Sequence, residues 1–400
     1  MKYNLSQIFV IKKFHLALIL IFLAIGMNDL FIMNYLNKIT GTDNLLWIFR
    51  FGVLLILILF GLHNYLSYFK LKLHYLIFIF LIAFVVLISS FNSFISLTDF
   101  TKNLLGHVFY IYIILYLLSS KEIITDKTIQ FIGVILLLLG ALSSLSFLLL
   151  GENNTVRDPA GTYLNIINFP TFGFIGLLLI SQKRVLIFYM VIMIILLISF
   201  LEINRSLFIA VIIFYLIIQK KDLGIFKLFS YSTWIILSLI TTLIVGILEF
   251  EQLSTTTFST GRGQIWMINW MQFINLDFLS ILFGNTINYD NTFDISENFD
   301  QINLSMNFFQ LHSTPLKTLL DYGIIGFILI MIIFKNKKQY RFDHSYDLIN
   351  ALFFSCFLLV SLNSSTSFIK MDIYVLLMFV ALAASNKNYR FRNKLNKQGD

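Results

Sequence analysis

The chain has 400 residues, of which 58% are hydrophobic and 12% are charged, and its formal net charge is +8. Soluble domains carry about 25% charged residues, so this composition excludes an ordinary soluble domain. A single cysteine, Cys356, lies within an apolar run, which excludes an intrachain disulfide and a multi-cysteine metal site.

Long apolar runs predict an all-α, polytopic membrane protein that forms one membrane domain over residues 1–400. A helix needs roughly 20 mostly apolar residues to cross the hydrocarbon core of a bilayer. The first run is longer than a signal-peptide core and lacks a small-residue cleavage site, so we expect it to be a span. The predicted spans, about twelve in chain order, are 14–36, 45–62, 73–91, 104–119, 129–150, 166–181, 185–202, 205–219, 229–249, 316–334, 348–363 and 371–385.

The positions of Lys and Arg predict the orientation of these spans. Cytoplasmic loops carry the excess of these residues, and with the N-terminus inside every inner segment contains at least one of them. Only eight of the 29 fall on the outer side: Lys38, Arg50, Lys102, Arg157, Arg205, Arg262, Lys317 and Lys370. We therefore expect both termini to be cytoplasmic, and we attribute the net charge to membrane topology rather than to a nucleic-acid partner.

One long loop, residues 250–315, joins the ninth and tenth spans on the outer side. Loops of this length in compact proteins are usually functional. Within it, Gln264–Leu276 is rich in Trp and Met, and tryptophan favours the membrane interface, so we expect an interfacial helix there. Three polar residues are spaced to share one side of that helix: Asn269, Gln272 and Asn275.

The predicted outer layer contains three arginines and one histidine that are candidates for chemistry: Arg157, Arg205, Arg262 and His312. The planar guanidinium group binds phosphate oxygens in a bidentate manner and stays charged at an interface. Histidine titrates near neutral pH and can act as a base toward a sugar hydroxyl. The set would suit a diphosphate group held at the membrane surface.

Each candidate also has an ordinary structural interpretation. Arg205 can snorkel from a helix end, as can Arg50 near the outer end of the second span. Arg262 can be an exposed loop charge, Arg157 can pair with neighbouring acidic residues, and His312 can be solvated. These alternatives stay open on the sequence alone.

No metal site or cofactor is expected. The acidic residues of the long loop match no calcium-loop spacing and are expected to be solvated: Asp290, Asp294, Glu297 and Asp300. The histidines outside that loop show no spacing of metal ligands: His63, His74 and His107.

The outer arginines and the histidine lie in four segments that carry a recognisable pattern. The segments are Arg157-Asp-Pro-Ala-Gly161-Thr-Tyr163 with Asn165; Asn204-Arg205-Ser206 before an apolar helix; Ser259-Thr260-Gly261-Arg262 with Trp266 and Leu282-Phe283-Gly284-Asn285; and Leu311-His312-Ser313 with Tyr322-Gly323-Ile324-Ile325-Gly326. In order and spacing, over about 150–335, they resemble the motifs of the O-antigen polymerase and O-antigen ligase superfamily of bacterial membrane glycosyltransferases. The residues before 150 resemble that family only in being apolar spans.

This resemblance implies a metal-independent polymerase in the bacterial inner membrane. Such an enzyme joins undecaprenyl-diphosphate-linked repeat units into O-antigen or capsular polysaccharide at the outer face. By the resemblance, His312, Arg262 and Arg205 are catalytic. Substrate binding would involve four residues: Arg157, Gly261, Asn204 and Ser313. The implied partners are the lipid-linked donor and acceptor, the lipid bilayer and a chain-length regulator protein.

Three alternatives remain beside this interpretation. An O-antigen ligase shares the same motifs and differs mainly in its acceptor. A flippase or transporter is compatible with twelve spans, although transporters bind substrate near the bilayer midplane and the central spans here are expected to carry almost no ionisable residues. A scaffold without chemistry is the third alternative.

Overall fold

The computed structural model describes residues 5–26, 45–65, 80–88, 97–119, 124–150, 163–164, 169–201, 204–219, 229–251, 262–284, 313–335, 344–362, 367–369 and 371–396. The all-α prediction is confirmed, with 14 helices in these ranges. They are α1 (Leu5–Gly26), α3 (Leu45–Tyr65), a helix over 80–88, α5 (Leu97–Ser119), α6 (Asp126–Leu150), α7 (Thr171–Ser181), α8 (Val185–Leu201), α9 (Arg205–Gln219), α11 (Tyr231–Glu251), α12 (Arg262–Ile274), α13 (Phe278–Phe283), α14 (Thr314–Ile333), α15 (His344–Leu362) and α16 (Ile373–Asn396).

Each of the twelve predicted apolar runs contains one of these helices, while α12 and α13 fall in the predicted long loop. Among the described residues, three segments are long and apolar enough to cross a membrane, namely Asp126–Leu145, Tyr231–Leu248 and Thr314–Ile333. Shorter apolar helices accompany them in most of the other runs. The apolar helices support a membrane protein, and the number and direction of its spans stay predictions.

The predicted start of the sixth span is wrong. Phe169 and Pro170, which the sequence placed inside it, form strand β2 (Phe169–Pro170), and α7 begins only at Thr171. β2 pairs antiparallel with β1 (Tyr163–Leu164). Proline has no N–H to donate within a helix, and Pro170 with φ −68° and ψ 144° is extended. The strand pair therefore turns the chain before the helix starts.

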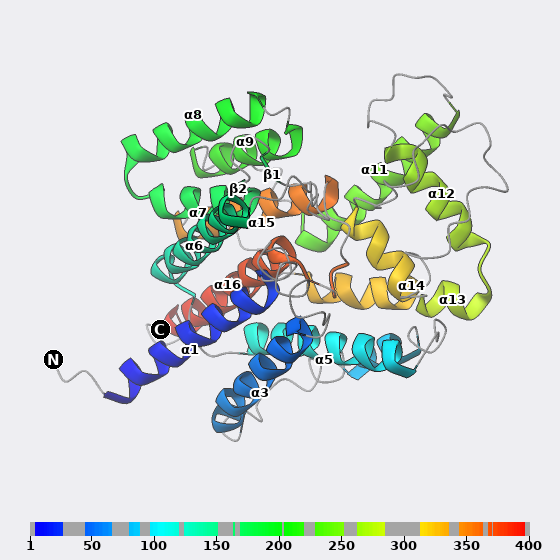
Figure 1. Cartoon of the computed structure of the whole chain (residues 1–400), viewed down its shortest axis with the longest axis horizontal. Helices are drawn as coiled ribbons and strands as arrows, with labels where there is room; N and C mark the ends of the chain where they lie inside the picture. Colours follow the sequence, from blue (N-terminus) through cyan, green and yellow to red (C-terminus); the bar gives the residue numbers. More distant parts are fainter. Residues whose placement is uncertain are drawn as a thin grey trace.

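The helices form three groups around α15. Figure 1 shows α11–α14 on the right, α6–α9 at the upper left and α1, α3 and α5 below, with α16 beside α1. Helix α15 packs against α9, α14 and α16. An aromatic contact connects α11 to this centre, because Tyr231 stacks on Phe353 with 3.6 Å between ring centroids and its hydroxyl donates to Asn350 Oδ1 at 2.8 Å.

Helix α8 exposes a large apolar surface. Leu186 is 74% exposed and Phe200 is 72% exposed, and the helix contains no charged residue. Soluble proteins rarely expose contiguous apolar surface of this kind, whereas contact with lipid removes its cost. The apolar outer surface of α8 thus agrees with a membrane environment.

Helix α12 lies where the sequence predicted a helix, but the three polar residues expected on one side of it differ in exposure. Asn269 is buried, and its side-chain amide donates to the Ile265 carbonyl at 2.8 Å, whereas Gln272 and Asn275 are exposed. Trp266 is also buried, because α12 packs against α11. Packing on α11, rather than contact with an interface, therefore determines the inner side of this helix.

Helix α14 is broken at Gly323, which has φ 64° and ψ −172°. Such a conformation is essentially reserved for glycine. The break lies directly against the end of α13, because a Cβ added at Gly323 would lie 2.4 Å from the Leu282 carbonyl carbon. A Cβ added at Gly284, which has φ 82°, would likewise lie 2.2 Å from the Asp321 carbonyl oxygen. The two backbones thus touch at a pair of glycines.

Gly323→Ala is expected to lower the melting temperature of the purified protein in detergent. The new methyl group would both strain the backbone, by about 1–3 kcal/mol, and push α13 away. Gly52→Ala in α3 is the control, because a Cβ there meets nothing within 4 Å and helix propensity favours Ala by ~1 kcal/mol. Equal melting temperatures for both variants would contradict the backbone contact.

Candidate functional site

Three of the seven predicted site residues lie outside the described part of the chain. This is the case for Arg157, Gly261 and His312. Arg262 is the first residue of α12, but its side chain is not described. The predicted gathering of three arginines and one histidine therefore stays a prediction.

The segment around Arg205 has a defined local geometry. Asn204 caps the N-terminus of α9, because its Oδ1 accepts hydrogen bonds from the Leu207 N–H at 3.1 Å and from the Ser206 hydroxyl at 3.0 Å. Asparagine is among the residues preferred at this capping position. The cap fixes Arg205 on the first turn of α9 with an exposed side chain. A guanidinium group at this position is accessible to an anionic ligand.

Ser313, the last predicted site residue, lies at the start of α14. It is 0% exposed, and its hydroxyl lies 3.5 Å from the hydroxyl of Thr242 on α11. The side chain makes no capping hydrogen bond to α14. The segment that follows His312 is therefore packed against α11 rather than open to solvent.

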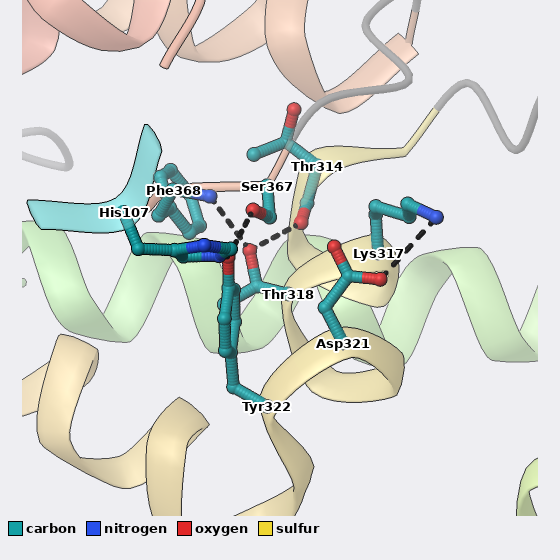
Figure 2. Close-up of polar contacts among 8 residues, drawn as sticks. All are labelled: His107, Thr314, Lys317, Thr318, Asp321, Tyr322, Ser367 and Phe368. Atoms are coloured by element: carbon teal, nitrogen blue, oxygen red, sulfur yellow. Dashed lines mark hydrogen bonds and ion pairs between the residues drawn. The ribbon is translucent and has the colours of Figure 1, made fainter. Parts of the chain in front are cut away.

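A buried polar cluster surrounds the first half of α14 (Figure 2). The Tyr322 hydroxyl lies 2.7 Å from Nε2 of His107 on α5 and accepts from the Ser367 hydroxyl at 3.3 Å. One turn earlier, Thr318 accepts from the Phe368 N–H at 2.9 Å and donates to the carbonyl at the start of the helix at 2.7 Å. Polar contacts therefore attach this half-helix to α5 and to the segment 367–369.

The same half-helix contains a buried ion pair. Lys317 Nζ lies 3.2 Å from Asp321 Oδ1, and the two residues are 7% and 0% exposed. Both residues lie within the segment predicted as the tenth span. Charged groups inside apolar spans are costly, and where they occur they usually mark a functional site.

Helix α13 is oriented by a capping aspartate. Asp277 Oδ1 accepts from the N–H groups of Leu279 and Ser280 at 3.0 and 3.1 Å. Hydrogen bonds from the Ser280 hydroxyl and from these N–H groups hold the pKa of the Asp277 carboxyl below its usual value. The capped helix ends at Gly284, against the break in α14. The segment with Leu282–Gly284 therefore contacts the segment with Tyr322–Gly323, and both were singled out in the sequence for their resemblance to glycosyltransferase motifs.

Arg50 is not a snorkelling residue in this structure. It is 6% exposed, its Nε donates to the Ala24 carbonyl at 3.4 Å, and its guanidinium carbon lies 5.6 Å from the centre of the Tyr110 ring. Asp29, which the sequence places near the outer end of the first predicted span, lies outside the described residues. Arg50 therefore joins α1, α3 and α5, and a structural role explains its position.

Sequence reasoning missed most of the buried cluster. Lys317 appeared only as an outer cation, His107 only as a residue without metal spacing, and Asp321 not at all. The spacing of four residues between Lys317 and Asp321 in an apolar run was a usable signal for an ion pair. No sequence signal exists for the contacts of Tyr322 with His107 and Ser367, which lie 215 and 45 residues away along the chain.

Comparison with known proteins adds no further assignment. No known protein family, curated protein or solved structure matches the chain. Among the described residues, no group of three or more acidic, histidine or cysteine residues could hold a metal ion. What these residues offer is an exposed arginine on α9 and a buried ammonium–carboxylate pair on α14.

Tyr322→Phe is expected to destabilise the protein by about 1–3 kcal/mol, because it removes a hydroxyl from a buried polar network. Thermal unfolding in detergent measures the effect. Tyr112→Phe is the matched control, since that hydroxyl is only partly buried and donates to one carbonyl, Leu57, at 3.0 Å. If Tyr322→Phe unfolds no earlier than the control, the cluster does not anchor α14.

Proposed function

We propose that the protein polymerises undecaprenyl-diphosphate-linked oligosaccharide repeat units into O-antigen or capsular polysaccharide. The reaction takes place at the outer face of the bacterial inner membrane, which the chain spans about twelve times with both termini in the cytoplasm. The enzyme is a metal-independent glycosyltransferase.

The observation that carries this proposal is the contact between α13 and the break in α14. It brings together Leu282–Gly284 and Tyr322–Gly323, two segments that resemble motifs of one glycosyltransferase superfamily. The other support is local, since Asn204 and Arg205 form a capped helix start with an exposed guanidinium group.

In the proposed reaction, an acceptor sugar hydroxyl attacks the anomeric carbon of the donor glycan. A new glycosidic bond forms, the bond to the diphosphate breaks, and undecaprenyl diphosphate leaves. Arg157, Arg205 and Arg262 stabilise the negative charge that develops on the departing diphosphate, since preorganised charges are most effective in the transition state. His312 takes the proton of the acceptor hydroxyl.

Deletion of the gene tests the proposal directly. Loss of the polysaccharide ladder, with accumulation of single lipid-linked repeat units, is the expected result. Long chains that persist on the lipid carrier without reaching a final acceptor would indicate an O-antigen ligase instead. An unchanged glycan profile would overturn both assignments.

Arg205→Ala and Arg262→Ala are each expected to abolish polymer. Loss of one such charge costs about 2.7–4 kcal/mol in the transition state, or roughly 10²–10³ in rate. Complementation of the deletion strain, with protein amounts measured by immunoblot, provides the readout. Arg184→Ala is the control, because Arg184 is exposed in the turn between α7 and α8, on the predicted cytoplasmic side. Full-length polymer from both site variants would refute the assignment of these arginines.

One observation favours a second candidate, a flippase or transporter. Transporters bind substrates where helices are broken inside the membrane and where buried charges lie. Helix α14 is broken at Gly323 and contains the buried pair Lys317–Asp321. Export of lipid-linked units in reconstituted vesicles, with single units retained on the cytoplasmic face in the deletion strain, would support this candidate over the polymerase.

A further inference from the structure

The N-terminus of α14 lacks the usual groups that neutralise a helix start. Ser313 provides no side-chain cap, and the first turn contains no acidic residue. The first N–H groups of a helix have no partner within the helix, and together they carry a partial positive charge. Pro315 contributes no N–H, so Thr314 and Leu316 supply the donors of this turn. The helix start is thus a buried region of positive potential.

A buried hydroxyl points beyond this helix start. Thr314 is 0% exposed, and its Oγ1 has no hydrogen-bond partner within the described residues. Figure 2 shows Oγ1 pointing opposite to the Thr314 carbonyl oxygen, toward the N-terminal end of α14. Because buried hydroxyl groups are normally hydrogen-bonded, this orientation indicates a polar ligand at that end.

Lys317 adds a full positive charge to the same turns. A cation near a helix N-terminus is unfavourable, and a buried cation is more so. Asp321, one turn later, compensates for part of this cost at 3.2 Å and fixes the direction of the ammonium group. An anion at the helix start would be favoured by both the ammonium group and the helix dipole.

We infer that the start of α14, with the Thr314 hydroxyl and the Lys317 ammonium group, binds the diphosphate of an isoprenoid-linked substrate. This inference rests on the proposed function and adds a buried binding region to the arginines. Lysine binds phosphate as a point charge, and a charge in a water-poor region acts more strongly than an exposed one. Asp321 is a positioning residue, which acts through Lys317.

The Thr314→Val variant separates binding from folding. Removal of a hydroxyl without a protein partner should leave the melting temperature of the ligand-free protein unchanged or raise it. The same change should weaken binding of farnesyl diphosphate by about tenfold, measured as ligand-induced thermal stabilisation in nanodiscs. Thr318→Val is the matched control, because its hydroxyl bonds Phe368 and Thr314, so it should lower the melting temperature without a change in affinity. Unchanged affinity in Thr314→Val would overturn the inference.

The charges are tested by a double variant, Lys317→Met with Asp321→Leu. Replacing a buried ion pair by apolar residues of similar volume is often neutral for stability, so the protein should fold. Its affinity for farnesyl diphosphate should fall by roughly tenfold or more. A double variant that folds and binds as the wild type does would overturn the assignment of Lys317.

Three further probes identify the source of the anion. Farnesol should not stabilise the wild type, and inorganic diphosphate should compete with farnesyl diphosphate. Stabilisation by phosphatidylglycerol nanodiscs alone, without an effect of farnesyl diphosphate, would overturn the inference in favour of a lipid headgroup site.

Normal polymer synthesis with unchanged binding in the variants would refute the binding region at the start of α14 but leave the proposed function standing. Binding here with an unchanged glycan ladder after deletion would refute the polymerase instead.

Discussion

The complete burial of the first half of α14 is the constraint on which the surrounding structure depends. Every residue from Ser313 to Gly323 is buried, including a lysine and an aspartate. A polar group in such surroundings must find a partner, and α5, α11 and the segment 367–369 each provide one. Helix α13 closes the remaining side by direct backbone contact. The positions of four other chain segments therefore depend on the burial of this half-helix before the break at Gly323.

The buried ion pair cannot be explained by stability. Desolvation of two charges commonly exceeds their mutual attraction, and apolar residues of the same volume would stabilise such a site at least as well. A stabilising role alone therefore does not explain why the half-helix retains Lys317 and Asp321 so far from solvent. The break at Gly323 separates this buried half-helix from the remainder of α14, which continues as an apolar helix.

The sequence predicted the helices well and their contacts poorly, for a physical reason. Apolar runs have to form helices in a membrane, since every backbone polar group must be satisfied internally, and so each of the twelve runs contains a helix. Contacts between helices depend on three-dimensional packing. The approach of Gly284 to Asp321 and the burial of Asn269 against α11 could therefore not be derived from spacing. The start of α7 was missed because Pro170 prefers an extended strand in spite of its apolar surroundings.

Polymerase and transporter make the same physical demand on α14, although they differ in what happens to the substrate. Both need a strongly hydrated anionic group to leave water, and both gain from positive charge that is already in place before the anion arrives. A helix start without a cap, a buried hydroxyl and a lysine held by an aspartate satisfy that demand. Under the two proposed functions, the difference lies in whether an acceptor sugar can approach a donor whose diphosphate is held at the start of α14. With an acceptor the diphosphate would be a leaving group, and without one the same site would only carry its ligand across.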